Sequence, residues 1–344
     1  MHTILVTGGL GFIGAHTTVA LQEQGFEVVI IDNLSNTRLS VLDGITAISG
    51  KKPIFYKIDL KEKGSISQVF KAHKIAGVIH FAASKAVNES VENPLLYYQN
   101  NLTSLINLLQ VMLENDCQNI IFSSSCTVYG QADTLPINED APIKPAESPY
   151  GNTKQIGEEI LLDTTKASVL KAIALRYFNP IGAHHSALIG ELPLGVPQNL
   201  IPFVTQTAAG IRPLLSIFGA DYPTIDGTAV RDYIHVVDLA NAHVKAVARL
   251  LDKKQIDAFE VFNVGTGKGT SVLQVIKTFE KVNHLKLNYK IVGRRAGDIT
   301  AAYADTAKAN TILGWSATQS LEDALISAWK WQKNFKVQNN NCQN

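Results

Sequence analysis

The stretch Ile4-Leu5-Val6-Thr7-Gly8-Gly9-Leu10-Gly11-Phe12-Ile13-Gly14 decides the fold of this chain. It opens as a short apolar strand, passes through glycines at positions 8, 11 and 14, and leads into a helical pattern. Glycine permits a sharp turn and a close approach of the backbone to a ligand, and the amides at a helix N-terminus attract anions. Glycines also serve ordinary turns, but the strand, loop and helix in this order predict a site for a dinucleotide pyrophosphate.

Strand and helix patterns alternate through the first half of the chain. Strands are expected at 4–7, 27–32, 54–59, 77–82, 119–124 and 171–178, with helices at 14–24, 66–73 and 99–115 among them. This alternation predicts an α/β fold with a Rossmann-type, doubly wound parallel sheet. After Asn179-Pro180 the pattern changes to Gly- and Pro-rich segments, which predicts a smaller C-terminal α+β domain that binds the substrate.

These changes of pattern give the expected domain boundaries. The cofactor domain should occupy residues 1–180 and the substrate domain residues 181–333. A helix at 238–251 and a strand at 260–264 indicate that about residues 236–264 return to the cofactor domain. The polar, asparagine-rich segment 334–344 is expected to be a disordered tail.

The composition limits the possible partners. Of the 344 residues, 18% are charged and the net charge is +1, so no broad basic surface for nucleic acid or an anionic membrane is expected. The N-terminus does not read as a signal peptide, and no apolar run reaches the roughly 18 residues of a spanning helix. Three unclustered cysteines suit a reducing compartment and no metal site. We therefore expect a cytoplasmic protein.

Two acidic residues at expected strand ends bear on the identity of the dinucleotide. Asp32 ends the second strand, where a carboxylate can accept hydrogen bonds from the adenosine ribose hydroxyls and repel a 2′-phosphate. This position favours NAD over NADP. Asp59 ends the third strand and is placed to meet the adenine, although a strand-end aspartate can equally be a turn former.

A second motif, Tyr-x-x-x-Lys, carries candidate catalytic groups. Pro149 at a helix start places Tyr150 and Lys154 on one face, one turn apart. An ammonium at about 4 Å is worth about 4 kcal/mol, or about three pKa units, so the pKa of Tyr150 is expected close to neutrality. Such a phenol can exchange a proton with a sugar hydroxyl. Ser125, after the fifth strand, can hydrogen-bond both the phenol and the reacting oxygen.

Together the glycine loop, Ser125, Tyr150 and Lys154 resemble the extended short-chain dehydrogenase/reductase family, whose members act on nucleotide sugars. Three further blocks, Phe81 to Val87, Arg176 to His184 and Asp221 to His235, are similar to the UDP-galactose 4-epimerase pattern within it. The resemblance extends from Thr3 to about Trp331. It implies tightly bound NAD, a UDP-sugar substrate and a homodimer formed by helices near 98–113 and 155–166.

The resemblance also implies residue roles. Cofactor contacts are expected from Gly8, Gly11, Phe12, Ile13, Gly14, Asp32, Asn33, Asn36, Asp59, Leu60, Phe81, Lys85, Asn100, Ser125, Tyr150, Lys154 and Tyr177. Substrate contacts are expected from Ser125, Tyr150, Asn179, Asn199, Leu200, Phe218, Arg231, Tyr233, Arg295, Asp298 and Ala302. Arginine can clamp a diphosphate, and an aromatic ring can stack on uracil.

The activity implied by this resemblance is the interconversion of UDP-galactose and UDP-glucose. The sugar is oxidised at C4, the 4-keto sugar rotates, and the hydride returns to its other face. A small residue at Ala302 leaves room for an N-acetyl group, which extends the expectation to UDP-N-acetylglucosamine and UDP-N-acetylgalactosamine.

Several alternatives remain open from sequence. A nucleotide-sugar 4,6-dehydratase shares the fold, but typically has Thr-Asp-Glu where this chain has Ser125-Cys126-Thr127. An epimerase of UDP-glucuronate or UDP-xylose is a second alternative, and an NAD-sensing scaffold that had lost catalysis is a third. Cys126 is expected to be a small buried thiol, and His184-His185 lacks the third spaced ligand of a metal site.

Overall fold

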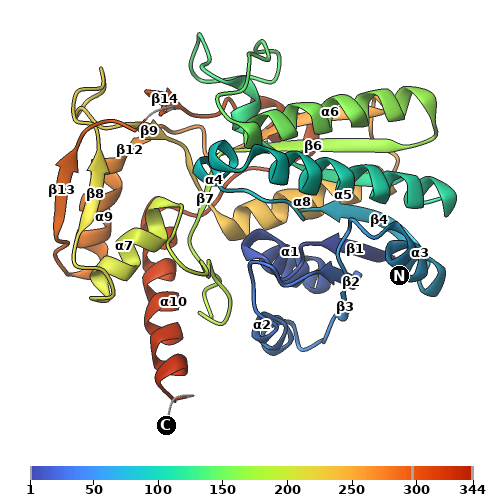
Figure 1. Cartoon of the computed structure of the whole chain (residues 1–344), viewed down its shortest axis with the longest axis horizontal. Coiled ribbons are helices and arrows are strands. Elements are labelled where there is room, and N and C mark those ends of the chain that lie inside the picture. The colour runs from blue at the N-terminus through green and yellow to red at the C-terminus, as the bar shows by residue number, and fades with distance from the viewer. Residues whose placement is uncertain (1, 296–297, 342–344) are drawn as a thin grey trace.

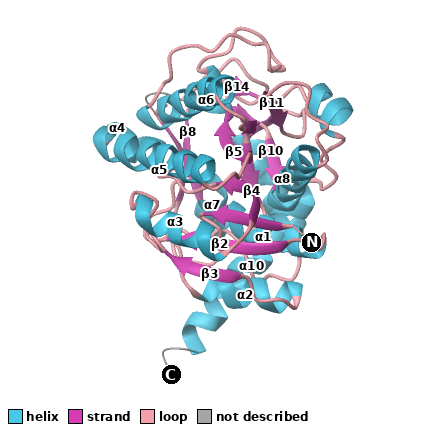
Figure 2. Cartoon of the chain, turned by 90° about the vertical axis from the view of Figure 1, so that its right-hand side faces the viewer, coloured by secondary structure: helices cyan, strands magenta, loops and turns pink. Residues whose placement is uncertain are grey.

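The protein is built around one seven-stranded parallel sheet. The structure is a computed structural model that describes residues 2–295 and 298–341. The strand order is β11-β6-β5-β4-β1-β2-β3, and every neighbouring pair is parallel. Figure 2 labels β5, β4, β2 and β3 of this sheet. The strands are β1 (Thr3–Thr7), β2 (Glu27–Asp32), β3 (Ile54–Lys57), β4 (Ile75–His80), β5 (Asn119–Ser125), β6 (Lys171–Tyr177) and β11 (Phe259–Val264). The predicted doubly wound parallel sheet is confirmed.

The central strands are apolar on both faces. In β2 the run Val28 to Ile31 is fully buried, as expected for a parallel strand covered by helices on either side. Two strands differ from the prediction by two residues, and the others agree within one residue. Strand β4 runs from Ile75, which pairs with Thr3, to His80, and β3 ends at Lys57. The apolar pattern continues past these paired ends through Ile58, Phe81 and Ala82, which are partly buried.

Helices cover both faces of the sheet (Figure 1). One face carries α1 (Phe12–Glu23), α2 (Ser40–Ser49) and α8 (Val236–Leu251), and the other carries α3 (Lys63–Ala72), α5 (Pro94–Glu114) and α6 (Pro149–Ala167), with the short α4 (Val87–Glu92) before α5. An apolar core lies on each face of the sheet, and alternate residues of β1 belong to different cores. Ile4 and Val6 lie in the same core as Leu239 of α8, and Leu5 lies in the same core as Leu105 of α5. Strand alternation thus divides one sheet between two apolar layers.

The remaining elements form a smaller α+β region. It contains β7 (Asn179–Ile181) paired with β10 (Tyr233–His235), the sheet β12 (Thr270–Ser271), β9 (Val230–Arg231) and β14 (Ala301–Ala302), the pair β8 (Leu215–Phe218) and β13 (Tyr289–Val292), and the helices α7 (Leu200–Ala208), α9 (Val272–Asn283) and α10 (Leu321–Asn341). Two short turns of helix, η1 (Cys126–Tyr129) and η2 (Ala309–Leu313), complete the described elements. Val275, Ile276 and Phe279 of α9 pack against Leu325 of α10 in a separate core.

The polar end of the chain begins inside a helix. Helix α10 continues to Asn341, past position 334 at which disorder was expected to begin. The Asn334 amide donates to the Ala187 carbonyl at 2.8 Å, and the Phe335 ring lies 5.5 Å from that of Trp331. These contacts hold the first tail residues on the protein, and residues 342–344 lie outside the described part. Within the described residues, no helix is long and apolar enough to cross a membrane.

Asp238, in the first turn of α8, fastens the segment before α10. Its carboxylate accepts hydrogen bonds from the Thr318 amide at 2.9 Å, the Thr318 hydroxyl at 2.8 Å and the Gln319 amide at 2.8 Å. Its carbonyl accepts from the indole nitrogen of Trp315 at 2.9 Å. The side chain is buried, so its loss would deprive the Thr318 and Gln319 donors of their acceptor.

We expect Asp238→Ala to lower the free energy of unfolding by about 3 kcal/mol, because several donors to a buried carboxylate lose their acceptor together. Denaturant unfolding followed by circular dichroism measures this loss. Asp252→Ala, at the exposed end of the same helix, is the control and should change stability by less than about 0.5 kcal/mol. Equal stabilities of the two variants would contradict the role given to Asp238.

Candidate active site

The expected cofactor residues gather at the carboxyl edge of the sheet. Gly8 follows β1, Asp32 ends β2, Phe81 follows β4, Ser125 ends β5 and Tyr177 ends β6. Since all these strands are parallel, their carboxyl ends lie along one edge, which is where open α/β sheets bind ligands. Ser125 and Tyr177 are direct neighbours across β5 and β6. The fold therefore assembles residues that are far apart in sequence.

The glycine loop has no room for side chains. Gly8 has a φ of +68°, in the left-handed region that favours glycine. A Cβ on Gly14 would lie 2.2 Å from the Gly8 carbonyl oxygen, so the loop folds tightly only with glycine there. Gly11 is the N-cap of α1 and provides no side-chain cap. The helix amides are therefore free of side-chain partners, and the loop fits a pyrophosphate.

Asp32 is held rigidly at this edge. Its carboxylate accepts from the Leu10 amide at 3.1 Å and from the Leu34 amide at 2.9 Å. Burial raises its pKa, against the effect of these two hydrogen bonds. Asn33 donates to Asp59 at 3.3 Å, which joins two further residues of the expected cofactor set. The carboxylate has remaining acceptor capacity, which fits the ribose of NAD.

Some expected cofactor residues lie less favourably. Leu60 is buried in the core, so it can offer a ligand only its backbone. Asn36 is exposed in the loop after β2. Asn100 donates to the Ser84 hydroxyl at 3.1 Å, which places it beside the segment that carries Lys85.

Ser125, Tyr150 and Lys154 come together as expected. Helix α6 starts at Pro149, and the Ser148 hydroxyl caps it by accepting from the Gly151 amide at 3.2 Å. The Ser125 side chain lies near enough to the Tyr150 phenol to lower the pKa of that phenol, and it accepts a hydrogen bond from the Thr127 amide at 3.2 Å. The Lys154 ammonium lies 5.8 Å from the centre of the Tyr150 ring.

The pKa of Tyr150 differs from the expectation. Burial raises it above its ordinary value, and the neighbouring Tyr177 raises it further, against the effect of Ser125. The Lys154 ammonium donates to the Ser123 carbonyl at 2.6 Å, and burial lowers the pKa of Lys154 to about 8. The expected shift toward neutrality was wrong for this state, because desolvation opposes charge on both groups. The sequence spacing predicted that Tyr150 and Lys154 lie close together, but it did not predict that both side chains are buried.

The expected substrate residues of the middle of the chain converge through four short strands. Asn179 pairs with Tyr233 across β7 and β10, and Arg231 pairs with Ala302 across β9 and β14. The Asp232 amide donates to the Ala302 carbonyl at 3.0 Å and its carbonyl accepts from Asn179 at 2.9 Å. These strands therefore hold the four residues around one segment.

A second group of expected substrate residues lies at the ends of β8 and β13. The Arg295 guanidinium lies 4.9 Å from the centre of the exposed Phe218 ring. Arg295 also pairs with Asp298 at 3.0 Å. Ala296 and Gly297, between these two residues, lie outside the described part of the chain. The arrangement provides one aromatic face with a cation beside it.

Glu191 was missed by the sequence analysis. Its carboxylate accepts from Asn199, the N-cap of α7, at 2.6 Å, and pairs with Lys85 at 3.3 Å. One oxygen thus joins an expected cofactor residue to an expected substrate residue. A single glutamate in a Gly- and Pro-rich loop offers no spacing that could have revealed it.

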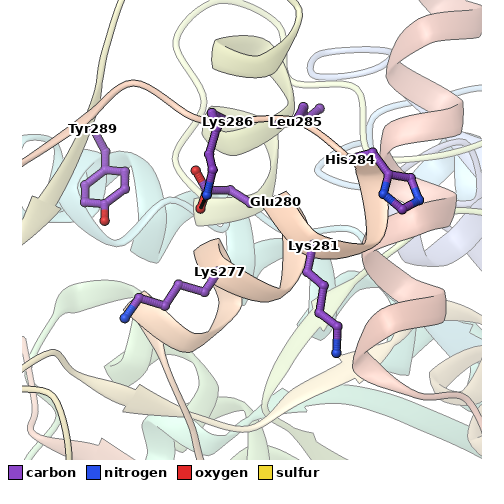
Figure 3. Close-up of a pocket in the computed structure, with 7 residues that line it drawn as sticks. All are labelled: Lys277, Glu280, Lys281, His284, Leu285, Lys286 and Tyr289. Carbon is purple, nitrogen blue, oxygen red and sulfur yellow. Dashed lines mark hydrogen bonds and ion pairs between the residues drawn. The ribbon is translucent and has the colours of Figure 1, made fainter.

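A surface hollow of about 770 Å³ lies away from this cluster (Figure 3). It is lined by Lys277, Glu280, Lys281, His284, Leu285, Lys286 and Tyr289. Tyr289 begins β13, whereas Phe218 ends the parallel β8, so the hollow and the Phe218 group occupy opposite ends of this pair.

Burial raises the pKa of the Cys126 thiol to about 11, which suits a thiol that stays protonated. No three His, Cys, Asp or Glu side chains among the described residues are grouped to hold a metal ion.

Comparisons with known proteins bear on this arrangement. A family model described as GDP-mannose 4,6 dehydratase matches residues 5–327. The UDP-glucose 4-epimerase of Bacillus subtilis is 50% identical over 330 residues, which cover 96% of each chain.

Two solved structures are also similar. The UDP-glucose 4-epimerase of Stenotrophomonas maltophila, with bound NAD and formylated UDP-arabinopyranose, has a TM-score of 0.95 at 44% identity and covers 98% of this chain and 100% of its own. That of Bifidobacterium longum, in complex with NAD⁺ and UDP, has a TM-score of 0.92 at 45% identity over 96% and 98% of the two chains. The resemblance noted from sequence is confirmed: this chain belongs to the UDP-glucose 4-epimerases of the extended short-chain dehydrogenase/reductase family.

Proposed function

We propose that this protein interconverts UDP-galactose and UDP-glucose with tightly bound NAD. The observation that carries this is the 50% identity to a UDP-glucose 4-epimerase along nearly the whole of both chains. The convergence of Ser125, Tyr150 and Lys154 at the carboxyl edge of the sheet supplies the chemistry. The Bifidobacterium longum relative, in complex with NAD⁺ and UDP, supports both ligands.

The cofactor fits the loop between β1 and α1. Gly8, Gly11 and Gly14 would let the pyrophosphate approach the backbone, and the amides of Phe12 and Ile13 would donate to it. Asp32 would accept from the adenosine ribose. When bound, NAD supplies the acceptor that removes a hydride from sugar C4 and later returns it.

Tyr150 would handle the proton of the sugar O4 hydroxyl. Its phenolate would accept this proton during oxidation and give it back during reduction, with Ser125 in position to hydrogen-bond the reacting oxygen. Burial keeps the phenol protonated in the described state, so its basic form requires nearby positive charge. The buried Lys154 ammonium provides such a charge.

Binding through UDP leaves the sugar free to turn. Phe218 would stack on uracil, while Arg231 and Arg295 would hold the diphosphate by charge-assisted hydrogen bonds. Asn199 and Leu200 at the start of α7 would complete the nucleotide contacts. The 4-keto sugar can then rotate and present its other face.

The matching family model is described as a 4,6 dehydratase, so that reaction is the alternative to weigh. Elimination of water needs an acid and a base beside the sugar. At the end of β5 this chain has Ser125, Cys126 and Thr127, and the Cys126 thiol has a raised pKa of about 11. The absence of an acidic pair at these positions favours epimerisation.

We expect purified protein to convert UDP-galactose to UDP-glucose without added NAD, and Tyr150→Phe to reduce kcat at least about 100-fold while it retains NAD. The substitution removes the proton-transfer oxygen and keeps the ring. Product chromatography and the absorbance of bound cofactor measure the two effects. Tyr289→Phe, in the hollow of Figure 3, is the matched control and should keep full activity. Near-wild-type turnover by Tyr150→Phe would remove Tyr150 from the mechanism.

We propose that the site also accepts N-acetylated UDP-sugars. Ala302 is 2% exposed and packs in a small cluster with Tyr129, Phe178 and Ala304, beside Cys126. It pairs with Arg231, another expected substrate residue, and this neighbour supports the proposal. An alanine would leave space that a bulky residue would fill, and Ala302 is the last residue of β14.

We expect Ala302→Tyr to abolish selectively the interconversion of UDP-N-acetylglucosamine and UDP-N-acetylgalactosamine, because an enclosed site cannot accept the added volume without strain. Comparison of kcat/KM for acetylated and plain sugars measures the selectivity. Ala301→Tyr, whose side chain points to the other face of β14, should leave the ratio unchanged. Wild-type protein without activity on the acetylated pair would refute the proposal.

We propose a homodimer formed by α5 and α6. The apolar side chains of α5 form two groups: Leu105 and Leu109 are buried on the sheet, whereas Ile106 is 41% and Leu113 is 38% exposed. Leu162 of α6 is exposed as well, and α5 and α6 pack against each other. Apolar side chains on two adjacent helices suit a face shared with a second copy.

We expect light scattering at micromolar concentration to give the mass of a dimer, and Ile106→Arg to give a monomer, because an unpaired charge would be buried in the interface. Ile256→Arg, at an exposed position before β11, is the control and should remain dimeric. A monomeric wild-type protein would reject this interface.

We also propose that the protein acts in the cytoplasm. The support is its cysteine usage: Cys117 and Cys126 are free, and neither is placed in a disulfide.

A further inference from the structure

A buried ion pair lies one helical turn beyond the catalytic lysine. Glu158 of α6 accepts two hydrogen bonds from Arg176 of β6, one from Nε at 2.9 Å and one from Nη2 at 2.6 Å. The Ser124 hydroxyl of β5 also donates to Glu158. All three side chains are buried. The proposed chemistry assigns none of them a task.

This cluster fixes the position of α6 on the sheet. Ser124 and Arg176 are directly opposite each other across β5 and β6, so their side chains share one face. Both reach the same Glu158 carboxylate on the helix that covers this face (Figure 1). Arg176 is held in turn by the Tyr129 hydroxyl, to which its Nη1 donates at 3.0 Å. A bidentate arginine with a third contact leaves the helix little freedom to slide or turn.

The helix transmits this position to the catalytic groups. Tyr150, Lys154 and Glu158 are spaced four residues apart and therefore lie along one face of α6. Lys154 is anchored to β5 by its bond to the Ser123 carbonyl, next to the Ser124 that binds Glu158. A displacement of Glu158 would thus move the ammonium relative to the end of β5.

Glu158 differs in charge from the other groups that surround Lys154. From the sheet, His80 of β4, the Phe122 ring at 5.0 Å and the Tyr177 phenol of β6 surround the catalytic pair. Burial lowers the pKa of His80 to about 3, and burial raises that of Tyr177 to about 12, so both are neutral near pH 7. Arg176, also on β6, is a cation. Glu158 is the carboxylate that acts on Lys154, and it raises the pKa that burial lowers to about 8.

We infer that Glu158 is a positioning residue of the proposed epimerase reaction: clamped by Arg176 and Ser124, it fixes the register of α6 and keeps Lys154 protonated beside Tyr150. This inference rests on the proposed function. Lys154 supports the basic form of Tyr150 only while it is charged. Glu158 therefore acts on the reaction through Lys154 and does not touch the sugar.

The test compares Glu158→Gln with Glu158→Asp in the holoenzyme as isolated. Without the carboxylate, the Lys154 ammonium should lose its proton about one pH unit lower. The basic limb of the kcat profile should move down by the same amount, with kcat about tenfold lower at the wild-type optimum and KM little changed. The Lys154 Cε signal in ¹³C-lysine NMR, assigned with Lys154→Arg, reports the titration without substrate. Glu158→Asp should restore part of both shifts.

A second buried arginine–glutamate pair provides the matched control. Arg249 donates to Glu260 at 2.7 and 2.8 Å, and Glu260 lies near the start of β11, away from the carboxyl edge. Glu260→Gln should lose stability as Glu158→Gln does, because each leaves a buried arginine unpaired, but it should leave both titrations unchanged. If Glu158→Gln fails to fold, the double variant Glu158→Gln with Arg176→Gln removes the orphaned charge and should still lower the Lys154 titration, because the carboxylate on the Lys154 face of α6 is gone.

The outcomes separate three cases. A lower titration of Lys154 in Glu158→Gln or the double variant, absent in Glu260→Gln, supports the inference. An unchanged Lys154 titration with an unchanged basic limb overturns it and leaves Glu158 a structural residue. Wild-type protein without epimerase activity would reject the proposed function alone, since the NMR titration still decides the role of Glu158.

Discussion

The parallel pairing of seven strands is the constraint on which the site depends. Parallel strands end at a common edge, so each loop after a strand delivers its residues to the same place. The glycine loop follows β1, which lies between β4 and β2, and β4 leads on to β5 and β6. The chain thus leaves β1 in one direction across the sheet and returns on the other side, and a crevice forms where the direction changes. The glycine loop after β1 and Ser125 at the end of β5 lie on opposite sides of this point.

Local sequence predicted the cofactor half well, for a physical reason. Strand β1, the glycines and α1 are consecutive, so periodicity and glycine spacing contain nearly all the information that shapes the loop. Asp32 was predictable because it ends a recognisable buried strand. The boundaries of β3 and β4 were shifted, since the apolar pattern continues through Ile58, Phe81 and Ala82, which have no partner in the ladder.

The other half depends on pairings that local patterns do not show. Strands of two or three residues, such as β9 and β14, are too short to have a period, and only the family resemblance connected Arg231 with Ala302. Glu191 and Glu158 gain their roles from partners far away in sequence. The same limit explains the error on Tyr150: the distance from lysine to phenol follows from helix geometry, whereas desolvation depends on the entire surrounding core.

The place of β11 has a consequence for how the protein is made. This strand forms the outer edge of the large sheet beside β6, yet the two are separated in sequence by the first part of the smaller region and by α8. On the ribosome, β6 emerges long before β11, and the edge of β6 that pairs with β11 stays unpaired while residues 178–258 are synthesised. The large sheet therefore cannot be complete when β1 to β6 have emerged. The nascent chain carries an unpaired strand, exposed to aggregation or chaperones, until Val264 has left the exit tunnel.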